Sequence, residues 1–288
     1  MSVPTNSTIR VKIIPISLTR SCLPPLCKRC CPRKKTRKAN TMRLAMLSDI
    51  HGNLHALEAV LADLRAYAAP DRTWVLGDLC LIGAHPAECL QRVRELPQVQ
   101  VISGNTDRRL VTGQRSHYRP KDAEEWAKFA GWLTQRDACH NWTISQLSYT
   151  DYEYLAALPP EIELHVPNYG WLLGYHGAPG NDEANLLPDT PADEVLDYFL
   201  DREGRFGVGG HTHIPMDRDL GTWRVVNLGS VGLPKDDPRA AYAIATFENG
   251  GVQVEIRRVA YDVEAALTAL AQSGNTAWQW AAENFKHA

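Results

Sequence analysis

The sequence of 288 residues lacks any apolar run long enough to cross a membrane. A transmembrane helix needs about 18 to 20 consecutive apolar residues. A recognisable secretory signal is also missing, because the apolar segment 13–18 is short and contains a proline. Such a signal needs an uninterrupted apolar core and a small-residue cleavage site. We therefore expect neither a membrane span nor a secretory signal.

Cysteine is sparse after residue 41. Four of the seven cysteines lie in residues 1–41, and Cys80, Cys89 and Cys139 are scattered over the rest of the chain. Three isolated cysteines do not make a disulfide framework in a domain of this size, so their pattern favours a reducing, cytoplasmic location.

Acidic residues are absent from positions 1–41, which contain ten Lys or Arg. The whole chain has 31 basic and 33 acidic residues, so 21 basic and 33 acidic residues belong to 42–288, a net charge of −12 there. A surface this acidic argues against an extended nucleic-acid interface. We expect a small phosphate-ester or nucleotide substrate bound at one focal site, and no membrane partner. The oligomeric state stays open.

Residues 1–41 differ from the rest of the chain in being basic and rich in cysteine. A zinc knuckle needs four well-spaced ligands, and the adjacent Cys30 and Cys31 fit that spacing poorly. We predict a disordered extension, with Met42 as the effective start of one domain that covers 42–288. The sequence does not decide whether residues 1–41 belong to the expressed protein.

After Met42, short apolar segments alternate with segments of helical periodicity, as in an α/β fold. The helical segments are 54–64, a helix that begins near Pro86, a helix over 191–200 capped by Thr190, and a last helix capped by Asp262 that ends near Gly274. Predicted strands that end in polar residues are 44–47, 73–76, 99–102, 171–175 and 206–210. Three further segments, 223–227, 240–247 and 252–259, are expected to be antiparallel strands.

A helical insertion interrupts this alternation at about 115–158. Its position after Asn105 predicts that it overhangs the ends of the strands. Its aromatic residues are Trp126, Trp132, Trp142 and Tyr149. They can stack on a nucleobase, or they form the hydrophobic face of a small helical cap, which is the interpretation we favour.

Seven polar side chains follow the predicted strands directly, where the loops of an open α/β sheet converge on a ligand. Cysteine is not among them, which argues against a structural zinc site. The mixed nitrogen and oxygen donors suit Mn²⁺ best, with Fe, Zn²⁺ or Ni²⁺ as alternatives. The candidate metal ligands are Asp49, His51, Asp78, Asn105, His176, His211 and His213.

The order of these motifs resembles the calcineurin-like metallophosphoesterase superfamily, and within it the bacterial YfcE-like and ApaH-like phosphoesterases. Further matching segments are Asp-Ile-His-Gly-Asn at 49–53, Asn-Leu-Gly-Ser-Val-Gly-Leu-Pro at 227–234, Pro-Arg-Ala at 238–240 and Tyr-Asp at 261–262. The resemblance implies a four-layer αββα sandwich and a metal-dependent phosphoric ester hydrolase.

The resemblance also implies two divalent ions. Asp49, His51, Asp78 and His213 would hold the first ion, and Asp78, Asn105, His176 and His211 would hold the second. A hydroxide between the two ions would attack the phosphate, with Asp78, Asn105 and His176 acting through the metals. No Gly-x-Ser-x-Gly elbow or Gly-x-x-x-x-Gly-Lys phosphate loop offers another route.

One position departs from the pattern: Thr106 stands where many members of the superfamily have a histidine that resembles a general acid. A hydroxyl is too weak an acid to replace an imidazole. We therefore predict a phosphodiesterase that prefers good leaving groups, such as aryl, cyclic-nucleotide or anhydride linkages. Whether another group protonates the leaving group stays open. His85, His117 and His140 are candidates, although each is expected to be a surface or structural histidine.

Two neighbouring residues have open roles. Asp107 is expected to orient a ligand or cap a helix, and Arg108 is a weak candidate for binding substrate phosphate, with a surface salt bridge as the alternative. For the whole protein, the alternatives are a dinucleoside-polyphosphate hydrolase, a protein phosphatase of the same superfamily, and a non-catalytic scaffold on the same fold. Fold alone does not decide between them.

Overall fold

The computed structural model describes residues 41–67, 69–114 and 118–285. The predicted disorder of 1–41 and the role of His117 therefore fall outside the described residues, apart from Thr41. Among the described residues, no helix has the length and apolar character that a membrane span requires.

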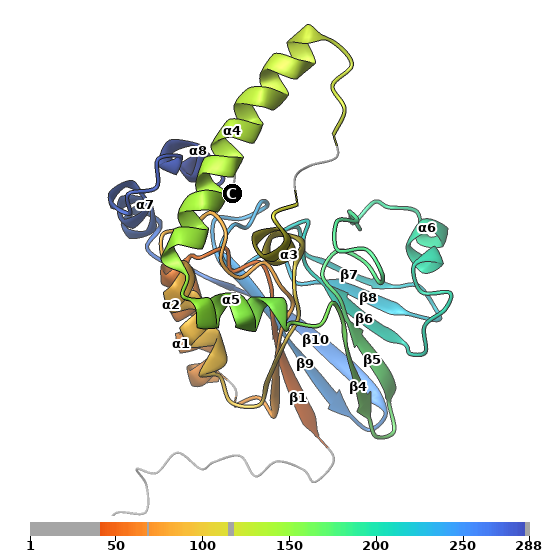
Figure 1. Cartoon of the computed structure of the whole chain (residues 1–288). Coiled ribbons are helices and arrows are strands. Elements are labelled where there is room, and N and C mark those ends of the chain that lie inside the picture. The colour runs from red at the N-terminus through yellow and green to blue at the C-terminus, as the bar shows by residue number, and fades with distance from the viewer. Residues whose placement is uncertain (1–40, 68, 115–117, 286–288) are drawn as a thin grey trace, which may run out of the picture. The chain divides into compact units, whose positions relative to one another are not determined.

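Ten strands form two five-stranded sheets (Figure 1). The first sheet has the order β10-β9-β1-β2-β3, with β1, β2 and β3 parallel and β9 antiparallel to both β1 and β10. Its strands are β1 (Met42–Leu47), β2 (Arg72–Val75), β3 (Val99–Val101), β9 (Ala240–Glu248) and β10 (Gly251–Val259).

The second sheet has the order β4-β5-β6-β8-β7, and it is also mixed. Strands β5, β6 and β8 run parallel, while β4 and β7 are antiparallel edges. Its strands are β4 (Ile162–Val166), β5 (Gly170–Gly174), β6 (Phe206–Gly209), β7 (Met216–Asp219) and β8 (Arg224–Asn227).

Helices α1 (Leu54–Tyr67) and α2 (Pro86–Arg94) cover the outer face of the first sheet (Figure 1). The apolar stripe of α1 is buried at Leu57, Val60 and Leu61. Each such side chain stabilises the fold by about 1.5–3 kcal/mol relative to an exposed one. The spacing of three and four residues that predicted this helix therefore produces its contact with the sheet.

The two sheets pack face to face through a second apolar core. Leu44 and Met46 of β1 point into this core, whereas Ala45 and Leu47 point toward α1 and α2. Both faces of β1 are buried, which explains why its sequence is apolar throughout and does not alternate.

A third core lies between the second sheet and α6 (Ala192–Asp197). It contains Val195 of α6 and Phe199, which follows α6, together with Tyr175 and Val225 of the sheet side. The layers are thus helix, sheet, sheet and helix, and the predicted αββα sandwich is confirmed.

Several predicted boundaries and pairings were wrong. Helix α6 ends at Asp197, and its N-cap position is Pro191 and not Thr190. The Thr190 hydroxyl does not cap the helix and instead accepts a hydrogen bond from Leu187 N (2.9 Å). Strand β8 is antiparallel only to β7 and runs parallel to β6. Four elements were not predicted: β4, β7, α3 (Asn105–Thr112) and α8 (Trp278–Glu283). Helix α7 (Val263–Gln272) begins after Asp262, as predicted.

The predicted insertion contains α4 (Ala123–Gln146) and α5 (Tyr149–Ala156). The C-terminal half of α4 joins the first core through Cys139 and packs against α2 and α8. Its N-terminal half projects from the sandwich (Figure 1). Trp126 and Trp132 are 57% and 41% exposed there, so they are not the buried face that we expected.

Candidate metal centre

Seven polar side chains meet at the carboxyl ends of strands from both sheets. The loops after β1, β2 and β3 provide Asp49 and His51, Asp78, and Asn105; those after β5 and β6 provide His176, and His211 and His213. Six of the seven side chains are buried, with His211 partly exposed. The structure therefore brings together all the candidate ligands, which the sequence separates by as many as 164 positions.

The backbone at these residues is unusual. In the part of the chain that the structure describes, nine non-glycine residues have a positive φ, and five of them are candidate ligands: Asp49, His51, Asp78, His211 and His213. A left-handed conformation costs a non-glycine residue roughly 1–3 kcal/mol. Such strain gathers at functional sites, because only a strongly determined surrounding fold maintains it.

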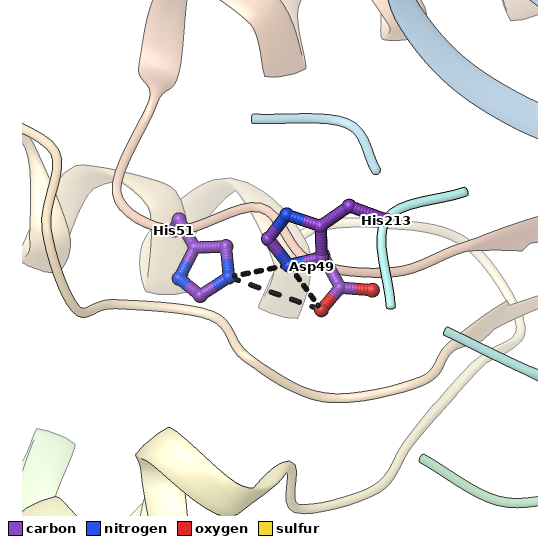
Figure 2. Close-up of side chains that lie close together, drawn as sticks. All are labelled: Asp49, His51 and His213. Atoms are coloured by element: carbon purple, nitrogen blue, oxygen red, sulfur yellow. Dashed lines mark hydrogen bonds and ion pairs between the residues drawn. The ribbon is translucent and has the colours of Figure 1, made fainter. Parts of the chain in front are cut away.

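Asp49, His51 and His213 form one cluster (Figure 2). His213 Nε2 lies 3.1 Å from Asp49 Oδ1 and 3.2 Å from His51 Nε2, and His51 Nε2 lies 3.5 Å from Asp78 Oδ2. The four side chains thus come together from three loops, as ligands of one ion do.

Asp78 connects this cluster to a second one. His176 Nε2 lies 3.4 Å from Asp78 Oδ1 and 3.1 Å from the Asn105 amide oxygen. His211 Nδ1 lies 3.3 Å from the Asn105 amide group. Because its two oxygens face different imidazoles, the Asp78 carboxylate can be shared between two ions.

Buried acceptor atoms gather in this centre. Asp49 Oδ1 is buried and has no hydrogen-bond partner among the described residues. Buried acceptors without partners are costly, and a cation satisfies several of them at once. The donors are imidazole nitrogens and carboxylate or amide oxygens, which fits divalent transition metals.

Three imidazoles are oriented by backbone carbonyls. The Nδ1 atoms of His51, His176 and His213 lie 3.1 Å, 2.7 Å and 2.6 Å from the carbonyl oxygens of Leu81, Leu76 and Leu233. A proton on Nδ1 that is donated to the carbonyl leaves Nε2 directed into the centre, where it binds a metal ion once it has lost any proton of its own. This arrangement is typical of metal-binding histidines.

Charges within the centre compensate one another. Burial alone would raise the pKa of Asp49, but the neighbouring His213 imidazole outweighs it and brings the pKa to about 2. Burial would lower the pKa of His176, but the Asp78 carboxylate raises it to about 10. The carboxylates are thus ionised at neutral pH and require positive charge beside them.

Two glycines allow the loops to approach this closely. A Cβ atom on Gly104 would collide with the carboxylate and backbone nitrogen of Asp78, and one on Gly210 would collide with Ser48 Oγ and Asp49 Oδ2. Glycine is therefore required at these two positions, because the neighbouring loop leaves no room for a side chain.

Asp107 fixes two of these loops. Its carboxylate is fully buried and accepts hydrogen bonds from the backbone N–H groups of Asp78 (2.7 Å), Leu79 (2.9 Å) and Gly104 (3.0 Å). Burial and the nearby Asp78 raise its pKa to about 7, although these hydrogen bonds oppose the rise. Asp107 therefore caps α3 and also holds the loop of Asp78.

Asn227 and Ser230 position the loops of the candidate ligands, a role that was not predicted from the sequence. Asn227 Nδ2 donates to Gly210 O (2.6 Å), and Ser230 Oγ donates to Asp49 O (2.8 Å). Both belong to the segment 227–234, whose match to the family pattern was the available signal. They connect the loop of His211 and His213 with the loop of Asp49.

The structure also places the residues of uncertain role. The backbone N–H of Thr106 donates to Asp78 Oδ1 (2.9 Å), while its buried hydroxyl has no partner among the described residues. Arg108 forms ion pairs with Asp182 and Glu183 (both 2.7 Å), in line with the salt-bridge alternative. His140, which we expected to be a surface or structural residue, is only 8% exposed.

A cavity of about 660 Å³ borders the centre through His176. Apolar residues of α3, α5 and the following loop line it, together with Arg108 and Arg202. Its volume lies within the 300–1,000 Å³ that is usual for small-molecule sites. No tryptophan lines this cavity in the described part of the chain, which removes support for nucleobase stacking by Trp126, Trp132 and Trp142 there.

Comparisons with known proteins agree with this geometry. A sequence model described as the calcineurin-like phosphoesterase superfamily domain matches residues 42–250. The uncharacterised protein MJ0912 of Methanocaldococcus jannaschii is 28% identical over 255 residues, which cover 82% of this chain and 94% of that protein.

Two further comparisons differ in extent. The crystal structure of a metallophosphoesterase from Sphaerobacter thermophilus superposes with a TM-score of 0.66 at 27% identity, covering 86% of this chain and 99% of that one. A symmetrical bis(5'-nucleosyl)-tetraphosphatase of Sodalis glossinidius is 38% identical over 84 residues, only 28% of this chain and 30% of that protein.

Proposed function

Because the chain belongs to the calcineurin-like phosphoesterase superfamily, we propose that it is a metal-dependent phosphodiesterase that uses two divalent ions. The observation that carries the proposal is the convergence of seven nitrogen and oxygen donors, six of them buried, in groups close enough to hold a metal ion. We expect Mn²⁺ to support activity best, and we expect a cytoplasmic location because Cys80, Cys89 and Cys139 are free and buried.

The proposed ligand sets follow the two clusters. Asp49, His51 and His213, with one oxygen of Asp78, would hold one ion. The other oxygen of Asp78 would hold a second ion, together with Asn105, His176 and His211. When bound, the two ions would supply a nucleophilic hydroxide at neutral pH and neutralise charge on the phosphate.

The side chains of the protein tune this centre in two ways. The Asp78 carboxylate would reduce the repulsion between two bound cations, whereas the neutral Asn105 amide would add an oxygen donor without adding negative charge. This limits repulsion of an anionic substrate. Asp107 holds the backbone of Asp78 and Gly104, so it fixes the distance between the loops.

The chain offers no strong acid at position 106. The Thr106 hydroxyl does not protonate a leaving oxygen effectively, so linkages with good leaving groups should react fastest. The neighbouring 660 Å³ cavity would receive the organic part of the substrate. Arg108 lines this cavity, but its pairing with Asp182 and Glu183 makes a direct role in phosphate binding weak.

Two other functions remain as rivals. A dinucleoside-polyphosphate hydrolase is supported by the partial match to the tetraphosphatase of Sodalis glossinidius. A non-catalytic scaffold would have the same fold but no turnover. The convergence of seven potential metal ligands favours an enzyme, because a scaffold does not need this arrangement of buried donors.

A substrate panel with Mn²⁺ tests the proposal. It compares bis-p-nitrophenyl phosphate, its monoester, cyclic nucleotides, dinucleotides and phosphopeptides. We expect the diester to be hydrolysed much faster than alkyl monoesters, and Asp78→Asn to lose at least a hundredfold in kcat/KM. Asp122→Asn is the matched control, because Asp122 caps α4 and asparagine caps equally well. Retained activity in Asp78→Asn refutes the proposal.

A further inference from the structure

Two buried basic residues, Arg136 and His140, lie on the part of α4 that faces α3. Arg136 and His140 are four residues apart on α4 and so share one helical face. With Arg109 of α3, they line a cavity of about 140 Å³. A cavity of roughly 150 Å³ admits a molecule of the size of benzene, so this one has room for a tetrahedral oxyanion.

Three buried nitrogen atoms of this group have no hydrogen-bond partner among the described residues. Arg136 is 4% exposed, and its Nε and Nη1 atoms have no hydrogen-bond partner among the described residues. The Nε2 atom of His140, which is 8% exposed, has none either. A buried polar group without a partner costs about 1–3 kcal/mol, and more if it is charged. An anion with several acceptor oxygens would satisfy these atoms together.

The carboxylates around the cavity do not satisfy these donors. Asp137 pairs with Nη2 of Arg136 (3.1 Å). The Nε and Nη1 atoms of Arg136 have no partner among the described residues. Glu183 Oε1 lies 2.9 Å from Arg109 Nη2 and is shared with Arg108. Burial, together with the charges of Arg136 and Arg109, lowers the pKa of His140 to about 4. The cavity thus has the positive potential that an anion would neutralise.

Arg109 connects this cavity with the metal centre. Its Nη1 atom lies 3.2 Å from the side-chain amide of Asn105, while the rest of its guanidinium borders the cavity. Asn105 and Arg109 are four residues apart on α3 and share one face. An anion held by Arg136 and His140 would therefore share the Arg109 guanidinium with a metal ligand.

We propose that Arg136, His140 and Arg109 bind a second anionic phosphoryl group of the substrate, next to the one that the metal centre cleaves. This rests on the proposed function and deepens it. The preferred substrates would be phosphoanhydrides, in which a second phosphate adjoins the scissile one, over diesters whose leaving group is a neutral aryl alcohol. Arginine suits this role because its planar donors match phosphate oxygens.

A comparison of two substrates tests the binding site in the Mn²⁺-loaded protein. One is a dinucleoside diphosphate, which has a second phosphoryl group, and the other is bis-p-nitrophenyl phosphate, which has none. We expect Arg136→Met and His140→Gln to raise the KM for the dinucleotide at least tenfold, with kcat within threefold. The diester should be unaffected. Lys128→Met is the matched control, because Lys128 is an exposed cation on the same helix.

A second readout does not depend on turnover. Inorganic phosphate is titrated into the protein while the imidazole signals are followed by NMR, with His140→Gln identifying the signal of His140. We expect phosphate to shift this signal and to raise the pKa of His140, and Arg136→Met to weaken the shift at least tenfold in phosphate concentration.

The outcomes separate this inference from the proposed function. Equal losses on both substrates, or no loss on either, overturn the anion site, as does an imidazole signal that phosphate leaves unchanged. If the wild type hydrolyses neither substrate but phosphate still shifts the His140 signal, the proposed function fails and the anion site stands.

Discussion

Asp107 provides the sharpest test of how the fold holds its metal loops. Its carboxylate accepts three backbone hydrogen bonds, from Asp78, Leu79 and Gly104, at 2.7–3.0 Å. Asp107→Ala removes both acceptor oxygens of these three hydrogen bonds and leaves three buried N–H groups without a partner. Each unsatisfied group costs about 1–3 kcal/mol, and water entering the space left by the carboxylate offsets part of the total. We expect a loss of about 3–5 kcal/mol.

Such a loss is large beside a total stability of about 5–15 kcal/mol. Urea unfolding measures it, through a lower midpoint at an unchanged dependence on denaturant. Because Asp107 also positions the backbone of Asp78, calorimetric titration should show Mn²⁺ affinity lowered about 10- to 100-fold.

The matched control is Asp122→Ala, which removes one hydrogen bond at the exposed start of α4. It should cost about 1 kcal/mol and leave metal affinity unchanged. If Asp107→Ala loses less than 1 kcal/mol, or if both variants weaken Mn²⁺ binding equally, the positioning role assigned to Asp107 is wrong.

Three further predictions concern other parts of the site. Gly210→Ala would drive a methyl group against Ser48 and Asp49, so calorimetry should show metal affinity lowered at least tenfold; unchanged affinity would contradict the close approach. Thr106→His should raise the ratio of alkyl-ester to aryl-ester hydrolysis at least tenfold, and an unchanged ratio would count against the missing-acid argument. Burial holds the pKa of His140 at about 4, below its ordinary 6.5. Between pH 6.5 and pH 4 the unfolded chain therefore binds a proton that the folded chain does not, and the free energy of unfolding falls as the pH falls. In urea unfolding, His140→Gln should therefore lose about 1–2 kcal/mol less than the wild type between pH 7 and pH 5, and equal losses would contradict this.

The seven candidate ligands were predictable because strand ends are readable in sequence. Asp49 and Asp78 follow apolar runs that stop abruptly, and the carboxyl ends of parallel strands share one edge of a sheet. The helix stripe of α1 and the cap at Asp262 were equally visible, since each depends on local spacing.

The parts that were missed depend on contacts that sequence does not display. Strand β7 (Met216–Asp219) is polar and short because it forms an edge, so it lacks the apolar pattern of a strand. The positions of Trp126 and Trp132 depend on how far α4 extends beyond the sandwich. No local pattern distinguishes an exposed aromatic residue from a buried one.

The anion cavity shows the same limit. His140 looked like any surface or structural histidine, because its burial depends on how α4 packs against α3 and the sandwich. The positioning roles of Asn227 and Ser230 likewise became visible only when their hydrogen bonds reached loops that are distant in sequence.

Metal stoichiometry tests the central claim most directly. The protein is loaded with Mn²⁺, freed of excess metal by gel filtration and assayed by mass spectrometry of the metal. We predict two Mn²⁺ ions per wild-type chain. His213→Ala and His176→Ala should each retain about one ion, because these histidines belong to different clusters. A wild-type chain that retains no metal, or variants that both retain two ions, would contradict it.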